Sequence, residues 1–189
     1  ATDNYGNKST CSNDIYFQRT PIDSIVFPLD DTLYCPSADI NDAGPAEIKE
    51  MHKQFLYYLI MHEMGHTLGL NHNMKSSQML SPAELNNKEI TRKIGLIGSV
   101  MDYPAINISS DKSKQGDYYT TVTGPYDSWA IEYGYTPFSA AEEESGLRKI
   151  LSRSTDPQLA FGNDGDDMRA PGKAMDPRVN VNDLSNDAI

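Results

Sequence analysis

The chain has 189 residues, a length typical of one domain with its own hydrophobic core. Its formal net charge of −11 argues against binding to nucleic-acid phosphates or to an anionic membrane surface. No apolar run approaches the roughly 18 residues of a membrane-spanning helix, and no signal peptide is recognisable at the start. We therefore expect no membrane insertion, and we expect the chain to be part of a longer protein.

Residues 1 to 46 are rich in turn-forming residues, between which lie two short β-prone pieces, Asp14–Phe17 and Ser24–Phe27. They predict a small, irregular, strand-bearing lobe. Cys11 and Cys35 fall in this lobe, and two cysteines alone leave both the bridged and the free form open.

A helix is predicted from Pro45, which suits a first helical position, with Glu47 in the first turn. Its apolar residues recur every three or four positions, at Ile48, Met51, Phe55 and Leu59. The same stripe leads into His62 and His66, so the helix is expected to present them from a buried face. His52 lies beside the stripe and is interpreted as structural or solvated.

The segment HEMGHTLGLNH, from His62 to His72, has the spacing of a metal site. His62 and His66 lie about 40° apart on one helical face, one turn from each other. Gly69 can adopt the left-handed conformation that ends a helix, which lets His72 return to the same metal. Three imidazoles would bind zinc and leave a fourth position for water, as in catalytic sites.

Glu63 lies beside this face, where a carboxylate can act as general base without being a ligand. Zinc lowers the pKa of bound water to about 7, so Glu63 would take a proton from the attacking water and pass it to the leaving amine. The pattern predicts metal-assisted hydrolysis of peptide bonds. Two other interpretations stay open, a non-proteolytic zinc-holding scaffold and hydrolysis of another acyl bond. Glu63 argues against the scaffold, because a structural site needs no base.

Beyond His72, residues 73–78 are predicted to form a polar loop, and Ser81 with Glu84 forms a capping box that begins a short helix. Gly95 and Gly98 interrupt the chain before SVMDYP, residues 99–104. The segment YDSWAIEYG predicts a compact helix with one face formed by Tyr126, Trp129, Ala130 and Tyr133. A further helix is expected over about residues 139–152, with acids early and bases late.

Residues 154–189 show no periodicity and predict either a loop that packs over the body or a connection to further chain. Within them Asp164, Asp166 and Asp167 form an acidic cluster. Clustered carboxylates suit calcium, but the spacing lacks the final glutamate of an EF-hand. A solvated acidic loop is therefore the favoured interpretation, and calcium is the less favoured one.

The long histidine motif followed by a methionine turn is the metzincin signature, and SVMDY resembles that turn, with Met101 in the methionine place and Tyr103 two residues on. The segments LNHNMKSS, GSVMDYPA, GPYDSWAIEYGY and DPRVNVNDL also resemble the Met-zincin domain of large bacterial exported zinc-dependent metalloproteases. The resemblance covers about residues 50–189. It implies one catalytic zinc, a peptide or protein substrate, flanking domains, and a periplasmic, cell-surface or extracellular location.

The resemblance also implies an α+β fold in a single catalytic domain. Residues 1–69 would form an upper lobe with strands and the active-site helix, and residues 70–189 a mostly irregular and helical lower lobe. Met101 would form an apolar floor beneath the metal without binding it. Tyr103 has two interpretations, a hydroxyl that approaches the metal or stabilises an oxyanion, and a tyrosine packed in the lower lobe.

Overall fold

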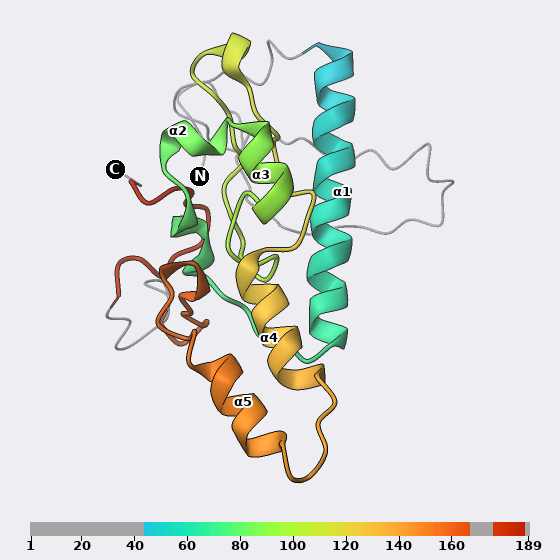
Figure 1. Ribbon diagram of the computed structural model, residues 1–189. Coiled ribbons are helices and arrows are strands. Elements are labelled where there is room, and N and C mark those ends of the chain that lie inside the picture. The colour runs from blue at the N-terminus through green and yellow to red at the C-terminus, as the bar shows by residue number, and fades with distance from the viewer. Residues whose placement is uncertain (1–43, 167–175, 188–189) are drawn as a thin grey trace. The chain divides into compact units, whose positions relative to one another are not determined.

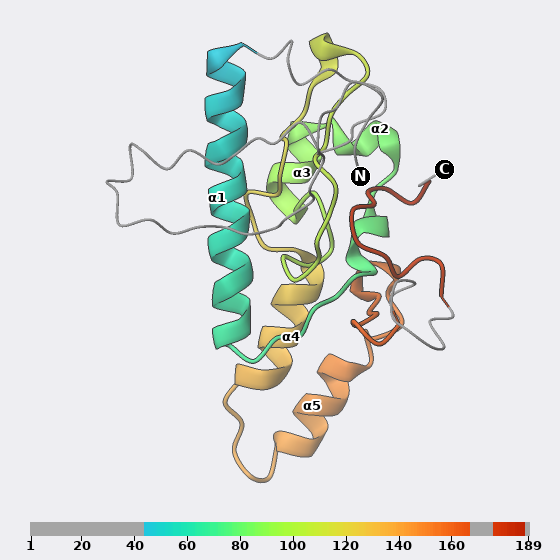
Figure 2. The ribbon, with the colours of Figure 1, turned by 180° about the vertical axis from the view of Figure 1, so that it is seen from behind.

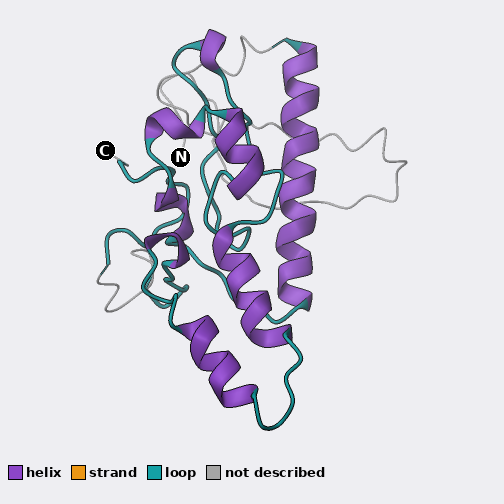
Figure 3. Cartoon of the chain, in the orientation of Figure 1, coloured by secondary structure: helices purple, strands orange, loops and turns teal. Residues whose placement is uncertain are grey.

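The computed structural model describes residues 44–166 and 176–187, which all belong to one compact unit, Ala43–Ile189 (Figure 1). The helices are α1 (Pro45–Thr67), α2 (Pro82–Leu85), α3 (Lys88–Ile94), α4 (Pro125–Tyr135) and α5 (Glu143–Leu151). Short 3-10 turns occur at Ser76–Met79, Lys112–Lys114 and Pro157–Leu159. Within these residues the chain has helices and loops but no strand (Figure 3). None of the described helices is apolar over a length that could cross a bilayer.

The strands expected at residues 14–17 and 24–27 lie outside the described residues, as do Cys11 and Cys35. The strand-bearing part of the predicted fold and the disulfide alternative therefore stay predictions.

Helix α1 begins where the sequence predicts. Pro45 occupies its first turn, and the Glu47 carboxylate accepts a hydrogen bond from the Gly44 N–H at 2.8 Å, which satisfies a backbone donor that the helix leaves without a partner. The helix ends after Thr67, and Gly69 has the predicted left-handed conformation, with φ at +85°. This turn sends the chain back toward the helix it has just left.

The buried face of α1 is rotated from the predicted stripe. It consists of Met51, Gln54, Tyr58, His62 and Gly65, whereas Ile48, Phe55 and Leu59 are half-buried. Gln54 explains the difference, because its amide donates to Asp117 and accepts from the Tyr118 N–H at 2.6 Å. A polar side chain with its hydrogen bonds satisfied can occupy a buried position that an apolar pattern alone assigns elsewhere. Figure 2 shows α1 alongside the loops that connect α3 and α4.

The segment after His72, which is predicted as a polar loop, is largely buried and includes a 3-10 turn. Asn73, Ser76 and Ser77 are all fully or nearly fully buried. They are polar because they bind neighbouring segments: the Ser76 hydroxyl and the Ser77 N–H both donate to the Asp102 carboxylate, at 2.8 and 2.7 Å. The capping box that begins α2 is confirmed, with Glu84 accepting from the Ser81 N–H at 2.9 Å.

The segment YDSWAIEYG lies in α4 as predicted, but its inner face differs. Tyr133 is 42% exposed, and the buried residue of the helix is Asp127. Before α4, Gly124 passes so close to the chain that a Cβ there would lie 2.1 Å from the Gly98 carbonyl oxygen. Helix α5 packs against α4 but is shorter than expected, since residues 139–142 form turns.

The described parts of the C-terminal region pack over the body, which is the first of the two alternatives considered for residues 154–189. Val179 and Val181 form an apolar cluster with Met74. Backbone hydrogen bonds add to this contact, from the Asn182 N–H to the Tyr103 carbonyl at 2.8 Å and from the Ser185 N–H to the Ser77 carbonyl at 3.0 Å. The segment that follows the histidine motif is thus covered by the end of the chain.

Candidate metal centre

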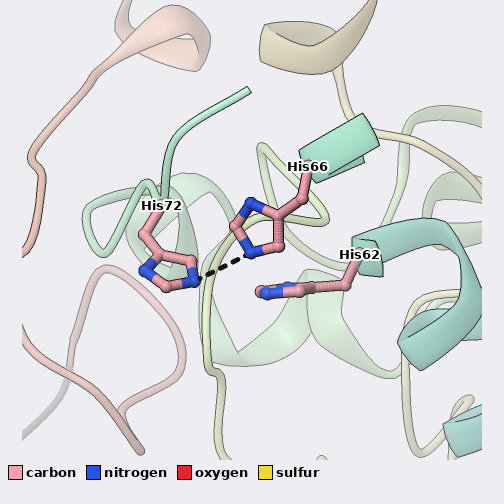
Figure 4. Close-up of side chains that lie close together, drawn as sticks. All are labelled: His62, His66 and His72. Carbon is pink, nitrogen blue, oxygen red and sulfur yellow. Dashed lines mark hydrogen bonds between the residues drawn. The ribbon is translucent and has the colours of Figure 1, made fainter. Parts of the chain in front are cut away.

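Three histidines from two segments face one another (Figure 4). His62 and His66 project from α1, and His72 comes from the segment that returns after Gly69. One potential ligand nitrogen from each ring lies within 4.8 Å of the others. In the part of the chain that the structure describes, this is the group of histidine, cysteine and acidic side chains that could hold a metal ion.

The two helical histidines are held through their Nδ1 atoms by backbone oxygens. The His62 Nδ1 lies 2.8 Å from the Val100 carbonyl oxygen, and the His66 Nδ1 lies 3.1 Å from the Leu70 carbonyl oxygen. A carbonyl oxygen only accepts, so each Nδ1 must carry the proton and donate. The Nε2 of each neutral ring is then left with a lone pair.

His72 is held in the same way by a side chain. Its Nδ1 lies 2.9 and 3.0 Å from the two carboxylate oxygens of Asp164, so this Nδ1 also donates. The Nε2 atoms of His66 and His72 are 3.1 Å apart (Figure 4). With both rings neutral, two lone pairs would face each other at this distance, an arrangement that a shared cation stabilises.

The His62 Nε2 is a buried nitrogen that has no hydrogen-bond partner among the described residues. Buried polar atoms in folded proteins almost always have partners, so an orphaned one beside two further lone pairs indicates a missing ligand. Burial lowers the pKa of His62, because it removes water from the charged imidazolium. The neutral imidazole is the form that binds a metal. The three rings thus fit a zinc ion by donor type, by tautomer and by this orphaned atom.

The methionine turn lies directly beneath α1. Met101 is fully buried, and its sulfur packs so close to Gly65 that a Cβ on Gly65 would lie 2.3 Å from it. Gly65 therefore allows the turn to approach the helix between the two helical histidines. The preceding residue, Val100, supplies the carbonyl that orients His62. The turn thus supports the site in two ways, by the packing of Met101 against Gly65 and by the hydrogen bond between Val100 and His62.

Asp127 of α4 fixes this turn. One of its carboxylate oxygens accepts from the Val100 and Gly124 N–H groups, at 2.9 and 2.8 Å, and the other accepts from the Ser99 hydroxyl at 2.5 Å. Burial raises the pKa of Asp127, and these three donors oppose the shift because they favour the carboxylate. The orientation of His62 on α1 therefore depends, through Val100, on the Asp127 carboxylate from α4.

Tyr103 and Glu63 complete the surroundings of the histidines. The Tyr103 hydroxyl lies 2.9 Å from the His72 Nε2, on the side where the ring nitrogens meet. Its backbone N–H donates to the Asp102 carboxylate at 2.7 Å. Burial raises the pKa of Tyr103, and the negative charge of Glu63 adds to the shift. Glu63 itself is exposed to solvent beside the buried His62.

A sequence model of the family described as Met-zincin matches residues 44–189, which is most of the chain. The chain belongs to the Met-zincin family. No curated protein and no solved structure matched it significantly. The match includes the histidine motif, the methionine turn and α4, so the Met-zincin domain is the unit whose geometry is described above.

Two structural residues of this Met-zincin domain were missed in the sequence. Gly65 stands inside the motif, directly before His66, but its contact with Met101 depends on a segment 36 positions later. Asp127 is one of two acids in the α4 segment, the other being Glu132. Its place at N3 of a helix that starts with proline indicates a cap, but nothing local indicates that it binds the methionine turn.

The acidic cluster is divided in the Met-zincin domain. Asp164 accepts from the His72 Nδ1, and Asp166 accepts from the backbone N–H of Asn163 at 3.3 Å. Asp167 lies outside the described residues. Among the described residues, the carboxylates are therefore not gathered around one point, and the calcium alternative gains no support. His52 stands apart from the histidine group, as predicted.

Proposed function

We propose that this Met-zincin domain is a zinc-dependent endopeptidase that hydrolyses peptide bonds by metal-activated water. The observation that carries the proposal is the convergence of three Nε2 lone pairs, from His62, His66 and His72, beside an exposed carboxylate. A purely structural zinc site is closed by four protein ligands. Here the described residues supply three histidines, and the neighbouring groups are a glutamate and a tyrosine hydroxyl.

In this proposal the chain's residues have separate roles. His62, His66 and His72 would hold the ion, which would lower the pKa of a bound water and polarise the scissile carbonyl. Glu63 takes the proton of the attacking water and returns it to the leaving amine. Its solvent exposure suits this role, because an exposed carboxylate can approach both oxygen and nitrogen.

We assign Tyr103 to the oxyanion. Of its two predicted roles, the geometry supports the first, since its hydroxyl lies 2.9 Å from the His72 Nε2 and its side chain is 41% exposed. A donor held beside the metal can stabilise the negative charge that develops on the carbonyl oxygen. Met101 has no such role, because its sulfur packs against Gly65 beneath the histidines.

The wider expectations belong to the same proposal. A two-lobed α+β domain, with strands among residues 1–46, an upper lobe of residues 1–69 and a lower lobe of residues 70–189, rests on the resemblance of the sequence to metzincins. The family match supports a Met-zincin domain over residues 44–189. It also supports a peptide or protein substrate. An exported location and flanking domains rest on the resemblance of the sequence to large exported metalloproteases.

A peptide-library digest tests the activity. The zinc-loaded protein is incubated with a diverse peptide mixture, and new termini are identified by mass spectrometry. We expect cuts that disappear in Glu63→Ala and persist in Glu143→Ala, a control that removes an exposed glutamate from α5. An intact, zinc-loaded protein that makes no cuts would favour the scaffold alternative. Hydrolysis of ester substrates alone would favour a different acyl bond.

A further inference from the structure

Asp164 contacts the third histidine from a distant part of the chain. Its two carboxylate oxygens lie 2.9 and 3.0 Å from the His72 Nδ1, although 92 residues separate the two side chains in sequence. The other two histidines have backbone carbonyls as partners. His72 thus differs from the other two in being held by a negatively charged group.

The loop that carries Asp164 is fixed to the residues that follow His72. The Asn73 side chain donates to the Ala160 carbonyl at 3.0 Å and accepts from the Gly162 N–H at 3.1 Å. The Met74 N–H donates to the Gly162 carbonyl at 2.7 Å. These three hydrogen bonds bracket Gly162, two residues before Asp164. The loop therefore holds Asp164 in register with His72.

We infer that Asp164 is a positioning residue for the third zinc ligand: its carboxylate holds the His72 Nδ1–H and thereby turns the His72 Nε2 toward His62 and His66. This rests on the proposed zinc site. A carboxylate on the far nitrogen fixes the tautomer and the ring orientation, and it makes the ligating nitrogen more basic. It also places one negative charge close to a dication that three neutral imidazoles leave uncompensated.

His72 needs this support more than the other two ligands. His62 is 1% exposed, and both His62 and His66 are fixed to the backbone of α1. His72 follows a glycine with positive φ and is held by a loop. The Asp164 side chain is 66% exposed, so its hydrogen bond with His72 contributes little to folding by itself. Its effect is expected in metal affinity.

Zinc affinity, measured by competition with a chromogenic chelator, tests the inference on the whole chain. Asp164→Ala removes the acceptor, Asp164→Asn keeps an acceptor but removes the charge, and Asp164→Glu keeps both. Asp166→Ala is the matched control, because it removes an equal charge two residues away. We expect a loss of about 10- to 100-fold for Asp164→Ala. Asp164→Asn should fall between this and the wild type, and Asp166→Ala should change affinity by less than about 2-fold.

Two further measurements separate positioning from folding. The melting temperature of the zinc-free protein should shift by less than about 2 °C in Asp164→Ala. In nitrogen-15 NMR, the His72 ring should keep its proton on Nδ1 in the wild type and exchange between tautomers in Asp164→Ala. Equal zinc affinities for Asp164→Ala and Asp166→Ala would overturn the inference, as would an unchanged His72 tautomer.

The proposed function and this inference fail in different ways. A wild-type chain that binds zinc, loses affinity in Asp164→Ala and cleaves no peptide would overturn the endopeptidase but keep the positioning role. Cleavage with unchanged zinc affinity in Asp164→Ala would do the reverse. A wild-type chain that binds no zinc would overturn both.

Discussion

The two sides of the metal centre are built differently. On the inner side, His62 is buried, its Nδ1 donates to the Val100 carbonyl, and the fully buried Met101 packs against Gly65 of the same helix. On the outer side, His72 is partly exposed, its Nδ1 donates to a carboxylate, and its segment begins at a glycine with positive φ. One ligand is held by packing and the other by charge.

This contrast shows how one site can combine rigidity with access. Close packing fixes a side chain because any movement opens a void or creates a clash. A charged partner fixes a ring orientation while the side chain stays open to solvent. In the proposed endopeptidase a substrate would reach the metal from the solvent side, so the ligand there cannot be sealed in a core. The contrast predicts large effects on stability for inner residues and small ones for outer residues.

Removal of zinc should have the largest effect on stability. At a free zinc concentration about 1,000 times Kd, the ion would add about 4 kcal/mol to the free energy of unfolding, and chelation would remove it. Hydrogen exchange should locate the change, with faster exchange at residues 69–74 and 160–164 and little change at 99–101. In His72→Ala, chelation should leave the unfolding midpoint where it was. Equal loosening of both sides would contradict the contrast.

Asp127→Ala should destabilise the inner side of the site by lowering the free energy of unfolding. It leaves the buried N–H groups of Val100 and Gly124 and the Ser99 hydroxyl without their acceptor, at a cost of about 3 kcal/mol. Urea unfolding of the zinc-free protein measures the loss. Asp187→Ala, which removes an exposed carboxyl, should change stability by less than about 0.5 kcal/mol. Similar values for the two variants would show that Asp127 does not fix the turn.

Gly65→Ala should destabilise the inner side by about 2 kcal/mol, because the new methyl group meets the Met101 sulfur. Combining it with Met101→Ala should restore part of the loss, since the clash disappears, and a double-mutant cycle measures the coupling. Gly134→Ala is the matched control. Its Cβ would meet no atom within 4 Å, so this change in α4 should be neutral or stabilising by up to about 1 kcal/mol. Additive effects of Gly65→Ala and Met101→Ala would argue against the contact.

Tyr103→Phe should have the smallest effect on stability and a clear effect on activity. The hydroxyl lies on the outer side, so the free energy of unfolding should change by less than about 0.5 kcal/mol, with zinc retained. If the hydroxyl stabilises the oxyanion, kcat should fall by about 10- to 100-fold while KM changes little. Tyr133→Phe, at a similarly exposed tyrosine, is the control. An unchanged kcat in Tyr103→Phe would leave this tyrosine a packing role only.

The sequence predicted the parts of the site that depend on local spacing. His62, His66 and Gly69 follow from the geometry of one helix and its end, and the return of His72 follows from the positive φ of that glycine. The start of α1 at Pro45 is equally local. For these residues the helical repeat and the backbone preferences of glycine and proline are sufficient to predict the local structure.

The missed features depend on contacts between distant segments. The burial of Gln54 requires Asp117 as a partner, 63 residues later. Asp127 and Asp164 act on histidines that lie far from them in sequence, and a single carboxylate carries no mark of its partner. The charge of Asp164 is visible in the sequence, where it favours a solvated loop. The residue type identifies a carboxylate, but the sequence does not show that this carboxylate binds His72.

The positive φ of Gly69 determines which stereoisomer of an amino acid position 69 can accept. At a φ of +85°, every L-residue with a side chain is strained, whereas a D-residue prefers this conformation. Chemical synthesis could therefore place D-alanine at position 69 and restrict the unfolded chain without strain in the folded one, a gain of about 0.4 to 1 kcal/mol. A D-residue at position 69 would then favour the turn that brings His72 back toward His62 and His66, even in the metal-free protein.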